Sequence, residues 1–273
     1  MLRMESETGW WLITHPDHAR LAGAFAAAWG NGLFRRPEPR DRVLYGISTH
    51  DDGWAARDAH LSITRQGKPS AFSRELVGAY SAFEEIEIAD YLAVRDRAVR
   101  LIADKDTYAG LLISMHTYNL LSERADRKTI APEGLVLLDD FLSRQRTYQR
   151  LLLDAIAVDN RLTAEHKEVR TIEDHFKLLQ ACDNLSLLSC VSFDRPANLL
   201  HALPLNDGNS AEVEVLPLGP RDFRISPWPF DTGELAFHFP ARHVVGRIFD
   251  SSARLDTAFQ ASRQEQLTVR LAR

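Results

Sequence analysis

Apolar residues recur every three or four positions over most of residues 9–192, which is the spacing of one face of an α-helix. The first such stretch begins at Thr14–Asp17, a sequence typical of a helix start, and ends at the turn Gly30-Asn31-Gly32. A second helix is predicted over 43–54, and four more follow from about residue 85. The breaks between those four lie near 104–106, 126–133 and 158–163.

The pattern differs in two other parts of the chain. Residues 55–78 show little periodicity and contain two glycines and Pro69, which predicts a long loop or a lid over a site. After Val191, prolines separate short alternating stretches that predict strands of a small antiparallel sheet. The expected strands are 211–218, 221–226, 234–239 and 266–272, with a short helix at 255–261.

These elements predict a mainly α protein with a small β-rich addition, an α+β arrangement. We expect a helical domain over residues 1–192 and a β-rich extension over 193–273 that packs on it. The composition, 45% hydrophobic and 26% charged, is ordinary for a globular protein. The formal net charge of −5 comes without a long basic stripe, which argues against a nucleic-acid partner. No apolar run reaches membrane-spanning length, so we expect a cytoplasmic protein, and a homo-oligomer is compatible with the composition.

Five polar residues fall on faces that the helical spacing predicts to be apolar. They are His18, His50, Asp51, His116 and Asp183. Imidazole and carboxylate groups are costly to bury unless something satisfies them, and a divalent metal ion is a common partner for both. Asp183 is the most informative of the five, because Leu179 and Leu187 lie on the turns before and after it. The sequence therefore predicts a metal site inside the helical domain.

The order His, His-Asp, His, Asp across successive helices resembles the HD superfamily of metal-dependent phosphohydrolases. It is most similar to an uncharacterised family of HD-like proteins, over about residues 9–192. The resemblance implies an HD-like helical bundle in which His18, His50, Asp51 and Asp183 hold one divalent ion. His116 lies where members with two metals place additional histidines, so it is either a ligand of a second ion or a core histidine bonded to a backbone carbonyl. The other histidines in this interval are His60, His166 and His175.

A divalent ion with open coordination positions lowers the pKa of a bound water and polarises a phosphoryl oxygen, so hydrolysis of a phosphate ester follows. We expect a small, phosphorylated or nucleotide-like substrate, and Asp51 and Asp52 as catalytic residues beside it. Arg20 is the expected cation for the phosphoryl charge, with Arg57 and Lys68 as alternatives. The general acid has no assignment unless Asp52 or Asp58 takes that role.

Residue types leave two other functions open. A di-iron oxygenase on the same scaffold would need two metal ions, and therefore His116 and one more histidine. A non-catalytic module that binds a metal or a small ligand would need no reactive water. The donor set does not distinguish Mn, Fe, Mg, Ni, Co and Zn.

Overall fold

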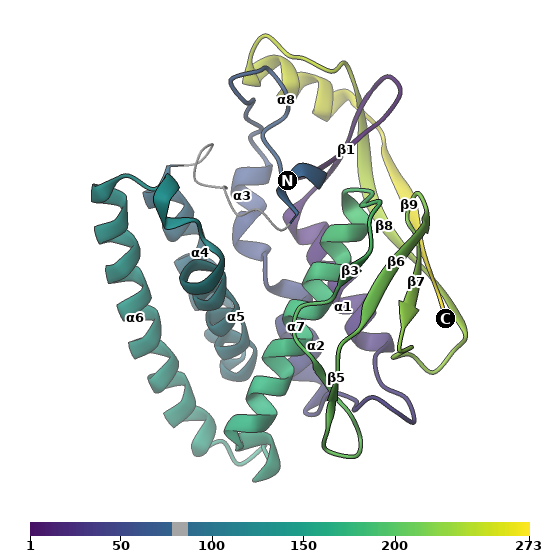
Figure 1. The fold of residues 1–273 in the computed structure, drawn as a ribbon. Coiled ribbons are helices and arrows are strands. Elements are labelled where there is room, and N and C mark those ends of the chain that lie inside the picture. The colour runs from purple at the N-terminus through teal and green to yellow at the C-terminus, as the bar shows by residue number, and fades with distance from the viewer. Residues whose placement is uncertain (78–86) are drawn as a thin grey trace.

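The computed structural model describes residues 1–77 and 87–273, which form a curled β-sheet on one side and layers of helices on the other (Figure 1). The helices are α1 (His15–Ala28), α2 (Arg40–Thr49), α3 (Ala55–Asp58), α4 (Ile88–Ala103), α5 (Thr107–Asn119), α6 (Pro132–Ala157), α7 (Val169–Cys190) and α8 (Ser252–Ala261). Shorter helical turns are η1 (Asp52–Trp54), η2 (Arg74–Leu76), η4 (Leu120–Arg124), η5 (Arg127–Thr129) and η6 (Glu165–Lys167). The predicted helix start near residue 85 and the end of the predicted loop at Gly78 lie outside the described residues.

One sheet takes strands from both ends of the chain. Its seven strands are β1 (Leu2–Glu5), β2 (Gly9–Ile13), β3 (Ala197–Asn198), β6 (Glu214–Gly219), β7 (Asp222–Ser226), β8 (Glu234–Val245) and β9 (Gln264–Ala272). Their order is β1-β2-β8-β9-β7-β6-β3, and all pairs are antiparallel except β7 with β9. A separate two-stranded ribbon joins β4 (Leu203–Pro204) and β5 (Ser210–Ala211).

The prediction of a mainly α, HD-like bundle with a small β extension is wrong. Helices make up about 50% of the structure and strands about 20%, and the sheet is large and curled. The sequence concealed β2 because it is buried on both faces, so its run of apolar residues shows no alternation. β2 pairs with β8 from the far end of the chain, with Gly9 opposite Val245 and Leu12 opposite Arg242. The sheet thus crosses the predicted boundary at residue 192.

Two local predictions also need correction. The helix predicted over 43–54 ends at Thr49, and Asp51 has backbone angles (φ −115°, ψ 15°) outside the helical region before η1 begins. The segment predicted as a lid is instead attached to β1: the Phe72 N–H donates to the Met1 carbonyl at 2.9 Å, and the Arg3 N–H donates to the Phe72 carbonyl at 2.8 Å. Leu61 and Ala71 of this segment are buried in an apolar cluster.

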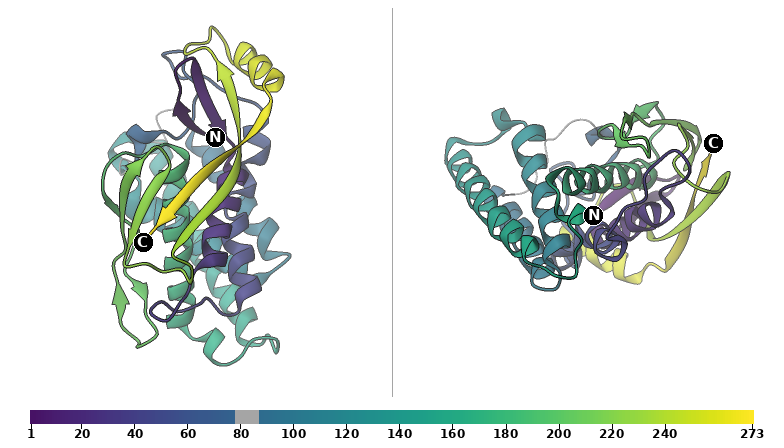
Figure 2. Two further views of the ribbon diagram at one scale, coloured as in Figure 1. Left: turned by 90° about the vertical axis from the view of Figure 1, so that its right-hand side faces the viewer. Right: turned by 90° about the horizontal axis from the view of Figure 1, so that it is seen from below.

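The helices form successive layers on the inner face of the sheet (Figure 2). α1 contacts β8, and α7 contacts β1, so these two helices lie directly against the strands. α2 packs on α1, α5 packs on both α2 and α7, and α4 and α6 flank α5. The main hydrophobic core fills the space between the sheet and α1, α2, α5 and α7. None of the described helices combines the length and apolar character that a membrane span needs.

Small residues allow the inner helices to approach closely. A Cβ atom on Gly23 of α1 would lie 2.6 Å from the Cβ of Ser48 of α2. One on Gly46 of α2 would lie 3.2 Å from Ala109 of α5. One on Gly53 of η1 would lie 2.6 Å from the Cβ of Ala98 and 2.8 Å from the backbone oxygen of Val94, both on α4. Each close contact joins segments that carry or adjoin one of the predicted site residues.

Replacing Gly53 with Ala should therefore destabilise the protein, because η1 must move away from α4 to make room for the methyl group. We expect a loss of about 1–3 kcal/mol in the free energy of unfolding, as for other overpacked cores, measured by urea denaturation. Gly32→Ala is the matched control, since a Cβ there meets nothing within 4 Å, and its effect should stay within about 0.5 kcal/mol. Equal stabilities of the two variants would contradict the packing argument.

Candidate metal centre

Four separate segments position the five predicted ligands. His18 lies one turn into α1, whose start is fixed by Thr14, because the Thr14 hydroxyl accepts a hydrogen bond from the Asp17 N–H. His50 and Asp51 lie between α2 and η1, where the helix has just ended. His116 is on α5 and Asp183 is on α7. All five side chains are buried, with 0–6% of their surface exposed.

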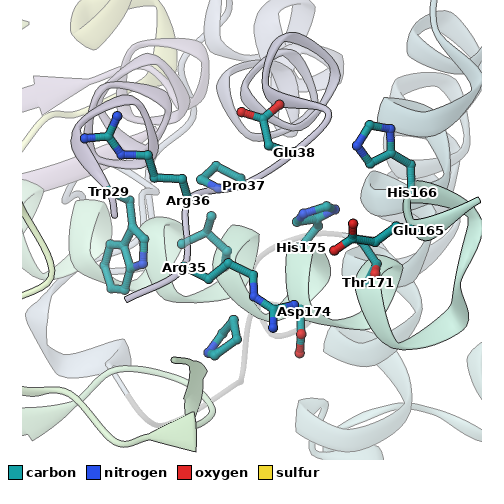
Figure 3. Close-up of a pocket in the computed structure, with 12 residues that line it drawn as sticks. Trp29, Arg35, Arg36, Pro37, Glu38, Glu165, His166, Thr171, Asp174 and His175 are labelled. Atoms are coloured by element: carbon teal, nitrogen blue, oxygen red, sulfur yellow. The ribbon is translucent and has the colours of Figure 1, made fainter. Parts of the chain in front are cut away.

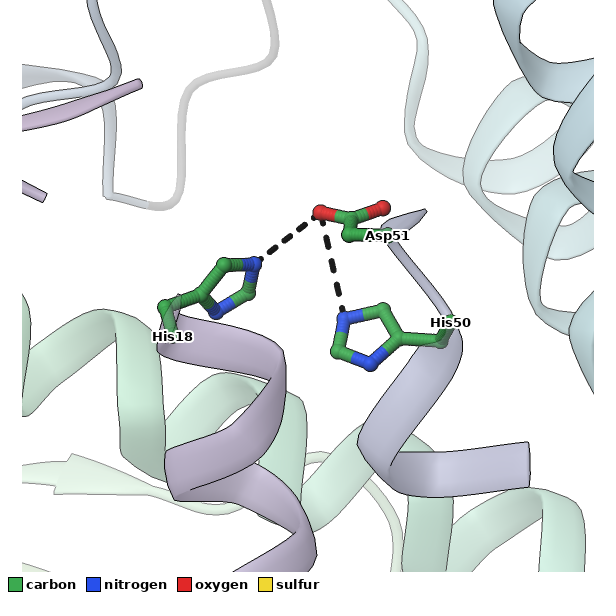
Figure 4. Close-up of side chains that lie close together, drawn as sticks. All are labelled: His18, His50 and Asp51. Carbon is green, nitrogen blue, oxygen red and sulfur yellow. Dashed lines mark hydrogen bonds and ion pairs between the residues drawn. The ribbon is translucent and has the colours of Figure 1, made fainter. Parts of the chain in front are cut away.

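His18, His50 and Asp51 form the first of two groups (Figure 4). Asp51 Oδ2 lies 3.0 Å from His18 Nε2 and 3.9 Å from His50 Nε2. The two imidazole rings are 5.2 Å apart and nearly perpendicular, so both ε-nitrogens face the same carboxylate oxygen. The structure thus brings the His-Asp pair together with the histidine of α1, as the sequence predicts.

The second group consists of His50, His116 and Asp183. Asp183 Oδ1 lies 3.2 Å from His50 Nε2, and Asp183 Oδ2 lies 3.8 Å from His116 Nε2. Asp183 Oδ1 is also 3.8 Å from His18 Nδ1. His50 belongs to both groups, so the five residues make one continuous cluster.

The outer nitrogens of His18 and His50 have hydrogen-bond partners that determine where their protons lie. His50 Nδ1–H donates to the Ile47 carbonyl at 2.7 Å. Ser186 Oγ uses its hydrogen on the Asp183 carbonyl at 2.8 Å, so His18 Nδ1–H must donate to Ser186 Oγ at 2.9 Å. An Nε2 that carries no proton therefore directs its lone pair at a carboxylate, where a metal ion can take the place of the proton. This is the arrangement in which histidines bind metal ions, with the second nitrogen held by an outer partner.

His116 is held less firmly. Its Nδ1 lies 3.4 Å from the side-chain nitrogen of Gln180, which also donates to Asn119 at 3.0 Å. The prediction that His116 is a second-metal ligand or a core histidine stays a prediction. His60, His166 and His175 belong to neither group.

Charges in the cluster are strongly coupled. Burial alone would lower the pKa of His50, but Asp51 and Asp183 outweigh it and raise this pKa to about 9. Burial would likewise raise the pKa of Asp51, yet Arg95 and His50 hold it well below its usual range. Burial lowers the pKa of His116 to about 3, with Asp183 only partly offsetting it. Two carboxylates thus remain ionised in a buried space that attracts positive charge.

Arg95 of α4 is a functional candidate that the sequence analysis missed. It is only 6% exposed, and its Nη1 donates to Asp51 Oδ1 at 2.6 Å. Its guanidinium lies over the rings of Trp54 and Tyr91, at 5.2 and 5.3 Å from their centres. The available signal was its spacing, because Arg95 lies four residues after Tyr91 and four before Val99 on the apolar face of α4.

The predicted catalytic residues Arg20 and Asp52 pair with each other near the surface. Arg20 Nη2 lies 2.9 Å from Asp52 Oδ1, and half of the Arg20 side chain is exposed. Across residues 1–77 and 87–273, neither forms a hydrogen bond or ion pair with the five cluster residues. Their catalytic roles stay predictions. Asp58 is buried and accepts from the His15 N–H at 2.5 Å, and the amine of Met1 donates to it at 2.7 Å.

Comparison with known proteins places the chain in a family without giving it an activity. The family described as Protein of unknown function (DUF3891) matches residues 1–245. The chain belongs to this family. No curated protein and no solved structure matches it. Any function of this DUF3891 protein must therefore be argued from the cluster itself.

The donor set fits a metal ion. Each group offers three ligand atoms, all within 4.8 Å of one another, from two imidazoles and one carboxylate. Atoms that bind a common ion at about 2.1 Å lie roughly 3.0–3.5 Å apart, close to the 3.0 and 3.2 Å contacts of Asp51 and Asp183. Buried lone pairs that face carboxylates need a cation or a proton between them. The His/Asp cluster could therefore hold a metal ion, whose identity the donors leave open.

Replacing Arg95 with Met should strongly destabilise the protein, because it leaves Asp51 Oδ1 buried without the guanidinium. We expect a loss of about 3–5 kcal/mol in the free energy of unfolding, measured by urea denaturation of the metal-free protein. Arg100→Met on the same helix is the control: Arg100 is half exposed and pairs with Asp96 at 2.7 Å, an interaction worth at most about 1 kcal/mol. Similar losses in the two variants would show that the Asp51 contact is not structural.

Proposed function

We propose that this DUF3891 protein is a metal-dependent phosphohydrolase that acts on a phosphate ester of a small molecule. The observation that carries the proposal is the convergence of His18, His50, Asp51 and Asp183 from α1, the α2–η1 junction and α7. A bound divalent ion would supply Lewis-acid activation of water and of the phosphoryl group. The resemblance of the His, His-Asp, His, Asp order to the HD superfamily supports the same reaction.

The arrangement favours one ion per chain. The ε-nitrogen of an imidazole has a single lone pair, and His50 belongs to both groups through this nitrogen. The two groups that share His50 therefore surround the position of a single ion. In this proposal His18, His50, Asp51 and Asp183 are its ligands, and His116 lies beside them. A di-iron oxygenase would need a separate donor set for its second iron, so this distribution of ligands favours hydrolysis.

Arg95 is the positive group best placed to assist. Its contact with Asp51 Oδ1 leaves Oδ2 to face His18 and His50, so Arg95 orients the carboxylate. In this proposal its charge also stabilises the negative charge that develops on the phosphoryl group, as a preorganised buried cation does. The proposal therefore gives Arg95 the role that the sequence analysis gave to Arg20.

The substrate class follows from the same site. A phosphomonoester or a nucleotide-like molecule carries the oxygens that a divalent ion and an arginine bind. The net charge of −5 and the absence of a basic stripe favour a small molecule over a nucleic acid. A cytoplasmic location is part of this proposal.

Metal-dependent turnover tests the proposal. The chelated protein should release no phosphate from p-nitrophenyl phosphate or nucleoside monophosphates, and adding Mn²⁺, Mg²⁺, Co²⁺ or Ni²⁺ should restore release. Asp183→Asn should lower the metal content and the turnover by at least about tenfold, because an amide is a neutral and poorer ligand. Asp139→Asn makes the same chemical change at an exposed ion pair with Arg127 and should change neither quantity.

Elemental analysis separates the competing outcomes. One ion per chain with metal-stimulated phosphate release supports the proposal. Two irons per chain with oxygen consumption would replace it with an oxygenase. A stoichiometric ion without turnover on any phosphate ester would make the protein a binding module, and equal metal contents of Asp183→Asn and its parent would remove Asp183 from the ligand set.

A further inference from the structure

A cavity lies between the N-terminal half of α7, the segment after α1 and η6 (Figure 3). Its volume is about 390 Å³, within the range of roughly 300–1,000 Å³ that small-molecule sites occupy. It is distinct from the metal centre, because its residue His175 precedes Asp183 by eight positions on α7, about 12 Å along the helix axis. Nothing in the proposed phosphohydrolase reaction uses it.

His175 contributes a hydrogen-bond donor to the lining of this cavity. It is 5% exposed, and its Nδ1 lies 2.8 Å from the hydroxyl of Tyr108. Burial raises the pKa of Tyr108, so the phenol keeps its hydrogen, and Nδ1 is the acceptor available to it. The neutral ring then carries its own hydrogen on Nε2. Burial, together with the nearby His166 and Arg35, lowers the pKa of His175 to about 3, so this neutral form persists near pH 7.

Two further donors line the same cavity. The guanidinium of Arg35 and the indole N–H of Trp29 have no hydrogen-bond or ion-pair partner among the described residues. Trp29 is 1% exposed, and Figure 3 shows its indole nitrogen on the side of the ring that faces Arg35. Three donors without a protein acceptor, one of them permanently charged, thus line one cavity that is partly open to solvent. These donors are available to a ligand that supplies acceptor atoms.

The three carboxylates that line the cavity have other contacts or are exposed. Asp174 lies 3.6 Å from the ammonium of Lys177, and Glu38 accepts from the Arg40 N–H at 3.0 Å. Glu165 is exposed. Pro37, Leu178 and Pro204 contribute apolar walls, and Arg36, His166 and Thr171 complete the lining. The lining therefore combines hydrogen-bond donors with apolar surface.

We propose that this cavity is a second binding site, for a small organic anion in which a carboxylate or phosphate group meets Arg35, His175 and Trp29. The apolar body of the ligand lies against Leu178 and the two prolines. The site is independent of the metal centre, and its occupant binds without a metal ion.

Benzoate and phenyl phosphate are suitable probes, with benzamide as the neutral isostere of benzoate. Titration calorimetry on the full chain in the presence of EDTA should show saturable binding of at least one anion and at least tenfold weaker binding of benzamide. Arg35→Gln should weaken the anion at least tenfold, and Arg35→Lys, which keeps the charge, should recover part of the loss. Arg150→Gln, a loss of charge on the exposed face of α6, should leave the affinity within twofold.

The two anions identify the ligand class, since preference for benzoate indicates a carboxylate and preference for phenyl phosphate indicates a phosphate. Asp183→Asn should bind either anion as the parent does, which separates this site from the metal centre. Absence of binding by both anions, equal binding of benzamide, or unchanged affinity in Arg35→Gln would overturn the proposal. His175→Asn supplies a second test of the same site if Arg35→Gln is poorly folded, with at least a threefold loss expected.

Discussion

Two buried contacts between an imidazole nitrogen and a carboxylate impose the main constraint on this structure. His18 faces Asp51 at 3.0 Å and His50 faces Asp183 at 3.2 Å, while outer partners occupy the δ-nitrogens of both rings. Such contacts are repulsive unless positive charge lies between them. The fold supplies part of that charge through Arg95 and leaves the rest to a proton or an ion. The four helical segments can pack around this cluster only if that positive charge is present.

The ligand cluster could be anticipated from the sequence because a polar residue within a helical apolar stripe is a strong local signal. Asp183 between Leu179 and Leu187 is the clearest case. Arg95 gave the same signal on α4 but was overlooked, since arginine on an amphipathic helix is usually exposed and only its three-dimensional neighbours show otherwise. The cavity lined by Trp29, Arg35 and His175 was also missed, because His175 lies 140 residues after Arg35 in the chain.

The fold was less predictable than the site. Helices α4 to α7 follow the apolar spacing, but the sheet depends on pairing between the two ends of the chain, which no local pattern reveals. β1 and β2 are only four and five residues long, and β2 has no polar face that would mark it as a strand. The position of Asp51 shows a related limit. Helical spacing placed it inside a helix, whereas the chain turns out of the helix at this residue.

The junction between β2 and α1 has a mechanical consequence. Only Thr14 separates the last residue of the strand from the helix that bears His18, and β2 is held by β1 on one side and β8 on the other. A helix joined so tightly to an interior strand of the sheet cannot detach while the strands remain paired. The sheet and the His/Asp cluster should thus open and close as one cooperative unit, and strain at either end of the chain would be transmitted to His18.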